Sequence, residues 1–274
     1  MSRDDDEQAV LDRFQRRYVL AKSDTMRELE RYVCGCDYGA TSWTTQDEAD
    51  QMAQALDLGP GKRLLDIGSG AGWPALYLAK QSGCDVVLTD VPLQGLQIAR
   101  ERAVEDTTDG ACWISVADGG ALPFRDASFD AVYHSDVLCC LPEKAAVLDS
   151  CRRVVCDDGR MLFTVISVTP GLQGRDLDQA LAGGPPFVET AAPYPDLIRN
   201  AGWDLVSATD LTSEYLATVR RVLDREDDFR AEISRVLDDQ DAEDSMAKRH
   251  ATVAALEAGL LRRDLFALTP RAVA

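Results

Sequence analysis

The chain has 274 residues, of which 46% are hydrophobic, and this is enough apolar material for one large core. Its formal net charge is −18, from 47 acidic and 29 basic residues, which argues against nucleic acid or an anionic membrane as a partner. The acidic start MSRDDDEQAV is unlike a signal peptide, and no apolar run is long enough to cross a bilayer. We therefore expect a cytoplasmic protein.

The first 57 residues are expected to form an N-terminal helical cap. Apolar residues recur at helical spacing over residues 5–33, which predicts one long helix there. The loop CGCDYGATSWTT follows it. Thr45 then precedes QDEADQMAQALDL in the position of an N-cap, and the glycines and proline of residues 59–61 end that second helix.

From residue 58 onward, strand-like and helix-like segments alternate. The predicted strands cover 63–67, 84–90, 112–117, 129–134 and 160–166, and the predicted helices cover 73–81, 92–105 and 142–155. Such alternation over a hundred residues indicates right-handed crossovers and a parallel sheet. We therefore expect residues 58–274 to form a single α/β domain.

The remainder of the chain is less regular. Residues 168–192 read as a loop rich in proline and glycine, and a loop of that length is typical of a lid or a binding loop. A helix at 194–201 and a strand at 203–209 follow. Residues 212–260 are charged and helical, and we expect two helices inserted before a last strand, RRDLFALTP. Their charge favours a solvated hairpin, but an apolar stripe leaves open a lid or a homodimer surface. This stripe consists of Leu216, Val219, Val222 and Leu223.

The eight cysteines include no C-x-x-C pair, and only two histidines could join them in a zinc cluster. Several cysteines lie inside apolar patterns, where a reduced cysteine behaves as a small hydrophobe. Cys34 and Cys36 could together bind a soft metal ion. The sequence favours plain reduced thiols, and we predict no metal site.

The stretch LLDIGSGAGW places a glycine turn directly after the first strand of the α/β domain. Glycines let backbone amides approach a ligand, because no Cβ is in the way. Asp66, two residues before the first of these glycines, would repel a pyrophosphate but attract a cationic ligand. Asp90 ends the second strand, where a carboxylate can accept two hydrogen bonds from ribose hydroxyls.

The third strand ends in VADGGALPF. Asp118 in this stretch can accept a hydrogen bond from an exocyclic amine such as that of adenine. The apolar side chains of Val91 and Leu122 could enclose the ring. The strand ends therefore predict a ligand that carries a positive charge, a ribose and an adenine.

Four motifs stand in order between about residues 58 and 167, and together they resemble class I S-adenosylmethionine-dependent methyltransferases: LLDIGSGAGW, VVLTD, VADGGALPFRDASFDAVY and LDSCRRVVCDDGRMLFTV. The stretch LPFRDASFDAV is most similar to the branch that methylates small molecules such as quinones, sterols and polyketides. The resemblance implies an α/β fold with a Rossmann-like, seven-stranded and mostly parallel sheet, helices on both faces and an antiparallel last strand. It also implies S-adenosylmethionine as the cofactor and a small-molecule acceptor.

The resemblance also carries a set of cofactor-binding residues over to this chain, all at or near strand ends. These are Asp66, Gly68, Ser69 and Gly70 at the methionine end, Asp90 at the ribose, Val91, Asp118 and Gly119 at the adenine, and His134 and Ser135 at the sulfonium. For the glycines the plain alternative is an ordinary tight turn. For Asp90 it is a helix N-cap.

The sequence identifies a catalytic base less clearly than it identifies the cofactor-binding residues. Many members of this branch have a histidine shortly after the fourth strand, where this chain has Cys140 in VLCCLPE. His134 could act as the base instead, because imidazole titrates near neutral pH, or it could simply pack against the cofactor. Catalysis could also proceed without a base, because methyl transfer from a sulfonium gains much from alignment and desolvation.

Tyr38, Trp43 and the 168–192 loop are the candidates for shaping the acceptor pocket, although the two aromatic residues could equally belong to the core of the cap. Two other functions remain open. One is a nicotinamide-dependent oxidoreductase, which the glycine spacing and Asp66 oppose. The other is a protein that binds S-adenosylmethionine and transfers nothing.

Overall fold

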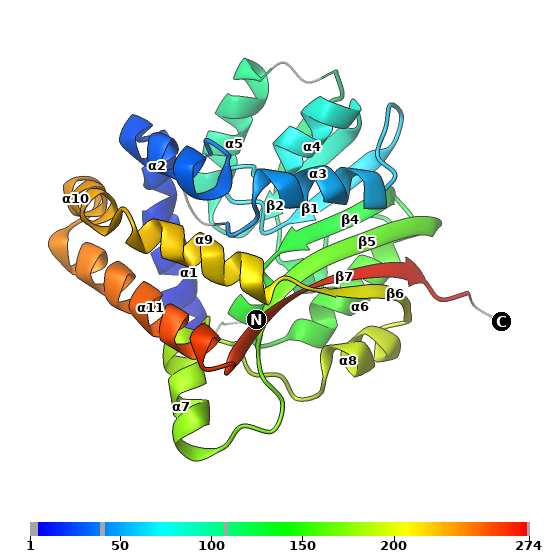
Figure 1. The fold of residues 1–274 in the computed structure, drawn as a ribbon. Helices are drawn as coiled ribbons and strands as arrows, with labels where there is room; N and C mark the ends of the chain where they lie inside the picture. Colours follow the sequence, from blue (N-terminus) through cyan, green and yellow to red (C-terminus); the bar gives the residue numbers. More distant parts are fainter. Residues whose placement is uncertain (1–4, 39–41, 107–108, 273–274) are drawn as a thin grey trace.

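The computed structural model describes residues 5–38, 42–106 and 109–272. Seven strands in these residues form one sheet in the order β3-β2-β1-β4-β5-β7-β6 (Figure 1). They are β1 (Arg63–Ile67), β2 (Asp85–Asp90), β3 (Cys112–Val116), β4 (Phe129–Ser135), β5 (Val155–Val168), β6 (Trp203–Asp210) and β7 (Leu261–Pro270). β1 to β5 pair in parallel, whereas β7 is antiparallel to both β5 and β6. The predicted mostly parallel sheet with an antiparallel last strand is therefore confirmed.

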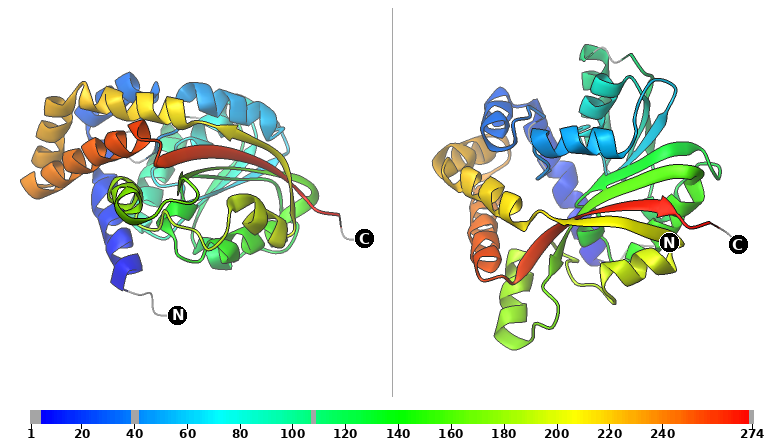
Figure 2. Two further views of the ribbon diagram at one scale, coloured as in Figure 1. Left: turned by 60° about the horizontal axis from the view of Figure 1, so that its bottom comes forward. Right: turned by 45° about the vertical axis from the view of Figure 1, so that its right-hand side comes forward.

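Helices cover both faces of the sheet, as predicted (Figures 1 and 2). One face carries α3 (Gln46–Ala55), α4 (Ala75–Ser82) and α5 (Leu93–Glu105), and the other carries α6 (Lys144–Val154) and α8 (Tyr194–Asn200). Neighbouring strand residues face opposite layers, so that Leu64 packs toward α3 and α4 while Leu65 packs toward α6. Because both layers bury the centre of the sheet, β1 and β4 are buried on both sides.

The prediction of a single helix over residues 5–33 was wrong. The chain forms α1 (Asp5–Arg17), a 3-10 segment η1 (Tyr18–Lys22) and α2 (Asp24–Cys34). Ser23 separates them, because its side-chain oxygen accepts a hydrogen bond of 3.0 Å from the amide of Met26 and so caps the start of α2. The break turns α2 away from α1.

The segment before the last strand contains three helices instead of the two expected. These are α9 (Thr212–Leu223), α10 (Glu226–Val236) and α11 (Asp239–Glu257). They are not a solvated hairpin, because Val222, Phe229 and Ile233 share a buried cluster with Leu29 and Val33 of α2. Figures 1 and 2 show α1, α2 and α9 to α11 gathered as one helical group at one end of the sheet.

The prediction of a continuous loop over residues 168–192 was also wrong, because α7 (Gly174–Gly183) lies inside it. The prolines and glycines mark the two ends of this helix and leave good helix formers in its middle. Gly183 packs tightly on α11, since a Cβ there would fall 2.7 Å from the carbonyl oxygen of Ala251. In the part of the chain that the structure describes, no helix is long and apolar enough to cross a membrane.

Candidate active site

A cavity of about 870 Å³ lies between the ends of the strands and the helical group. One side, here called the strand-end wall, is formed by residues that end or follow β1, β2, β3 and β4: Gly68, Ser69, Asp90, Val91, Asp118, Gly119 and Ser135. The other side, the helical wall, includes Arg17, Glu30, Trp43, Tyr215, Phe229 and Arg249. The volume is in the range of pockets that hold small organic ligands.

The glycine turn forms the centre of the strand-end wall. Gly68 and Gly70 have φ angles of 67° and 50°, which side chains other than glycine rarely adopt. A Cβ on Gly68 would fall 2.5 Å from the side chain of Val137. Ser69 ties the turn to β2, because both its amide and its hydroxyl donate to the carbonyl oxygen of Thr89 at 3.0 Å. The turn is thus held in place by backbone geometry and by the neighbouring strand.

The carboxylate of Asp90 accepts three hydrogen bonds. Its Oδ2 accepts hydrogen bonds from the Tyr18 hydroxyl at 2.8 Å and from the Gly70 amide at 2.9 Å, and its Oδ1 accepts from the Val91 amide at 2.8 Å. Burial raises the pKa of Asp90, and these three donors partly offset the rise. The contact between Tyr18 of the cap and Asp90 could not be predicted from local sequence, because 72 residues separate the two.

Asp66 lies behind the glycine turn and does not line the cavity. Its Oδ2 is buried and has no hydrogen-bond partner among the described residues. Burial and the nearby Asp90 raise the pKa of Asp66 well above its usual value. A positively charged ligand bound nearby would favour the ionised form of both carboxyl groups.

The structure brings most of the predicted site residues to the cavity. Nine line it: Tyr38, Trp43, Gly68, Ser69, Asp90, Val91, Asp118, Gly119 and Ser135. Three do not: Asp66 and Gly70, which lie directly behind the lining residues, and His134. Leu122 is also absent from the wall, because its side chain is buried in the core that packs against α6.

His134 does not have the position of a general base. Its side chain is fully buried and stacks on Phe163, with the ring centroids 4.8 Å apart. Both ring nitrogens lack a hydrogen-bond partner among the described residues. Burial lowers the pKa of His134 to about 3, so the ring is neutral at physiological pH. Its side chain does not line the cavity, so we expect it neither to receive a proton from an acceptor nor to contact a bound cofactor.

The helical wall is built from aromatic and charged side chains that lie far apart in the sequence. Trp43 packs edge-on against Tyr215 with centroids 5.2 Å apart, and the guanidinium of Arg249 lies 5.8 Å from the centre of the Trp43 ring. Arg249 donates to the carbonyl and hydroxyl oxygens of Ser245, but its buried Nε has no partner among the described residues. Burial raises the pKa of Glu30 to about 7, and the positive charge of Arg249 partly offsets this rise.

A buried ion network joins the two walls, because it links Asp136 just after the end of β4 to Arg263, whose guanidinium lies 5.9 Å from the centre of the Tyr215 ring. Arg263 of β7 is fully buried and donates to Asp136 at 3.1 Å and to Glu48 of α3 at 3.0 Å. Asp136 lines the cavity with φ at 53°, and the preceding Ser135 donates to or accepts from Thr44 at 2.7 Å. The network therefore fixes the end of β4 relative to the cap. The sequence pointed to Ser135 but not to Asp136 or Arg263.

Comparison with known proteins agrees with this geometry. Residues 65–163, which span the glycine turn and strands β1 to β4, match the family model described as a methyltransferase domain. The central part of the chain is therefore similar to a methyltransferase domain. The resemblance to class I S-adenosylmethionine-dependent enzymes, inferred from the motifs, is confirmed.

Methyltransferase GfsG of Streptomyces halstedii is 30% identical over 180 residues, and the match covers 64% of this chain and 64% of that protein. The chain thus spans less than two thirds of the length of this relative. Two solved structures share the fold. Phosphoethanolamine N-methyltransferase 2 of Haemonchus contortus, bound to phosphomonomethylethanolamine and S-adenosylhomocysteine, has a TM-score of 0.74 at 18% identity, with 97% of this chain and 60% of that chain covered. The [4+2]-cyclase SpnF has a TM-score of 0.70 at 21% identity, with 93% and 96% covered.

Proposed function

We propose that this protein transfers the methyl group of S-adenosylmethionine to a small-molecule acceptor. The observation that carries the proposal is the single cavity in which the strand-end wall of the methyltransferase domain faces the helical wall. A cofactor held on the first wall and an acceptor held against the second would share one enclosed space. Such an arrangement removes most of the entropic cost of bringing two reactants together.

The residues of the strand-end wall fit this cofactor. The unpartnered Oδ2 of Asp66 and the adjacent carboxylate of Asp90 suit a ligand with a positive charge. Oδ1 of Asp90 accepts only the Val91 amide among the described residues, which leaves it free to accept a ribose hydroxyl. We assign Asp118 and Gly119 to the adenine, and Gly68 and Ser69 to the methionine end. When bound, S-adenosylmethionine supplies a methyl group on a positively charged sulfur.

The helical wall would bind and align the acceptor. Trp43 and Tyr215 offer flat apolar surfaces, and Arg249 offers an unpaired donor beside them. The cap and the insert helices also keep water from the reacting atoms, which favours transfer. No imidazole takes part, because His134 is buried away from the cavity. Alignment and exclusion of water are therefore the main contributions of the protein.

A second candidate function is a [4+2] cyclisation, which is suggested by the structural match to the [4+2]-cyclase SpnF over 96% of that chain. A fold does not determine a reaction, so cofactor binding alone would not separate the two functions. The deciding measurement is turnover of the cofactor.

The experiment mixes the full chain with S-adenosylmethionine and, one at a time, phenols, amines, thiols and carboxylic acids. Mass spectrometry follows the formation of S-adenosylhomocysteine. We expect formation that depends on one class of acceptor and is strongly reduced in Asp90→Asn. Binding of the cofactor without turnover on any class would contradict the proposal and favour the second candidate.

Three expectations about partners and location stay predictions. We predict that the protein forms a homodimer, that it binds neither nucleic acid nor membranes, and that it is cytoplasmic. We also propose that residues 1–57 and the insert, predicted over 212–260, act together as the cap of the domain that begins at residue 58. Their shared buried cluster supports this division.

A further inference from the structure

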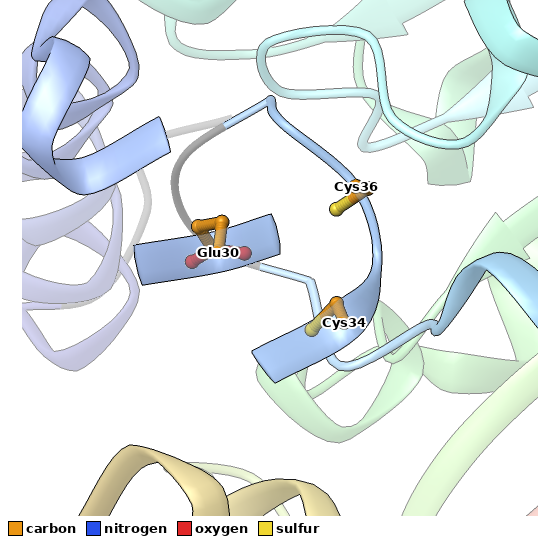
Figure 3. Close-up of side chains that lie close together, drawn as sticks. All are labelled: Glu30, Cys34 and Cys36. Carbon is orange, nitrogen blue, oxygen red and sulfur yellow. The ribbon is translucent and has the colours of Figure 1, made fainter. Parts of the chain in front are cut away.

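Two cysteines and a carboxylate of α2 come together at the edge of the cavity. Glu30, Cys34 and Cys36 each offer one ligand atom, and these three atoms lie within 4.8 Å of one another (Figure 3). All three residues line the cavity. The sequence pointed only to the two cysteines, and the expectation of no metal site rested on the lack of a third donor.

Local backbone geometry explains why these groups meet. Glu30 and Cys34 are four residues apart on a helix and so lie on the same face of α2. Gly35 ends the helix with φ at 76°, and this left-handed turn brings the Cys36 side chain back toward Cys34. The Cys34 and Cys36 side chains are 4% and 7% exposed, so the thiols are shielded from bulk water.

We propose that Glu30, Cys34 and Cys36 form a binding site for a thiophilic divalent cation of the Zn²⁺ class, with one coordination position open to the cavity. Thiolate sulfur selects soft or borderline ions over Mg²⁺ and Ca²⁺, and two sulfurs with one carboxylate oxygen match three of the four ligands of a tetrahedral zinc ion. Three protein ligands with a fourth position left open is the arrangement of catalytic zinc sites.

The charges around the cluster are compatible with this donor set. Two thiolates and a carboxylate carry three negative charges, one more than a divalent ion neutralises. The positive charges of Arg17 and Arg249 favour the negatively charged form of Glu30, and that of Arg221 favours the thiolate of Cys34. Arg221 and Arg17 donate to uncharged oxygens, those of Val33 and Ser245. In the described part of the chain, none of the three arginines is held in an ion pair, so their charge remains available to the loaded site.

The open position would face the space assigned to the acceptor, where a thiolate, phenolate or carboxylate group could become the fourth ligand. This last step rests on the proposed methyl transfer, whereas the metal site itself does not. Metal binding is therefore measured without cofactor or acceptor, so that a failure of either proposal can be told from a failure of the other.

The test is equilibrium dialysis of the reduced full chain against buffered Zn²⁺. We expect one ion per chain, with affinity lowered about 100-fold or more in Cys34→Ser and Cys36→Ser and about 10-fold or more in Glu30→Gln. Two matched controls, Glu28→Gln on the exposed side of α2 and Cys112→Ser on β3, should bind like the wild type. Failure to take up one ion, or uptake unchanged in Cys34→Ser and Glu30→Gln, would overturn the site.

A second measurement covers the case in which a cysteine variant does not fold. Co²⁺ replaces Zn²⁺ in the wild type and in Glu30→Gln, and absorption in the near ultraviolet reports bonds from thiolate to cobalt. The proposal expects thiolate bands in the wild type and altered bands in Glu30→Gln. Their absence in the wild type would show that the two cysteines do not bind the ion.

Discussion

The two walls of the cavity are built in different ways. The strand-end wall consists of residues at or just after the ends of neighbouring parallel strands, and its shape depends on backbone conformation at Gly68 and on the hydrogen bonds of Asp90. The helical wall brings together side chains from the cap and the insert, such as Trp43 and Arg249, which are more than 200 residues apart in sequence. Here the shape depends on packing of helices and on side-chain identity.

This difference shows where specificity is set. A wall made of backbone and strand ends can bind the same cofactor in many proteins that share one fold. A wall made of distant side chains can change with few substitutions and without disturbing the sheet. The four predictions below test whether the walls are separate in stability and in binding.

The largest effect is expected where the two walls are joined. Replacing Arg263 by Met leaves the carboxylates of Glu48 and Asp136 buried without their partner and should lower the free energy of unfolding by about 3–5 kcal/mol. Urea unfolding checks this. The neighbouring Arg262, whose side chain is 41% exposed and pairs with Asp264, is the control, and Arg262→Met should cost about 1 kcal/mol or less. Equal losses in the two variants would show that the network does not join the walls.

The next effect concerns the strand-end wall alone. Asp90→Asn keeps the shape of the side chain but removes its charge, and it should weaken binding of S-adenosylhomocysteine by about 1.5–3 kcal/mol, or roughly 10- to 150-fold. Equilibrium dialysis with labelled ligand measures this. Tyr18→Phe removes one donor to the same carboxylate and should have a smaller effect. An unchanged affinity in Asp90→Asn would mean that Asp90 only holds Tyr18, Gly70 and Val91 together.

A third prediction uses pH. The pKa of His134 is about 3 in the folded protein and near 6.5 when unfolded. Below pH 6.5 the unfolded chain therefore binds a proton at His134 that the folded chain does not, and the contribution of His134 to stability falls as the pH drops from about 6.5 toward 3. His134→Phe should remove up to about 1.4 kcal/mol of this loss per pH unit, as measured by urea unfolding at several pH values.

The same variant tests the base hypothesis. Turnover of His134→Phe near neutral pH should stay within about twofold of the wild type, since general base catalysis contributes at least about 100-fold where it operates. His250→Gln is the control, because His250 is exposed and pairs with Glu226. A 100-fold loss of turnover in His134→Phe alone would restore His134 as the base.

The smallest effect on the cofactor is expected from the helical wall. Trp43→Leu and Arg249→Met should leave the affinity for S-adenosylhomocysteine within about twofold, because neither residue belongs to the strand-end wall. The KM for an acceptor should rise in both. Titration calorimetry with S-adenosylhomocysteine measures the first quantity. A tenfold loss of cofactor affinity would show that the helical wall also binds the cofactor.

The difference between the two walls also explains which site residues could be predicted from the sequence. Alternating strands and helices fix which residues stand at strand ends, so Gly68, Asp90 and Asp118 could be found without a structure. His134 was misplaced because β4 is buried on both faces: Tyr133 packs toward α4 and His134 toward Phe163, so neither side chain reaches the cavity. Only Ser135, at the end of the strand, lines it.

The helical wall could not be predicted, because no local pattern records which distant helices will pack together. The break at Ser23 redirects α2, and this places Glu30 on the cavity. The signal for the break was present, since serine before a helix is a common N-cap, but the regular spacing of apolar residues concealed it. The contact between Tyr18 and Asp90 had no sequence signal.

The most direct test of the account is a crystal structure of the full chain with S-adenosylhomocysteine. The account predicts the ribose within hydrogen-bond distance of Asp90, the adenine beside Asp118 and Gly119, and the sulfur facing the helical wall at Trp43. Ligand bound against Trp43 and Arg249, with Asp90 making no contact to the ribose, would contradict the assignment of the two walls.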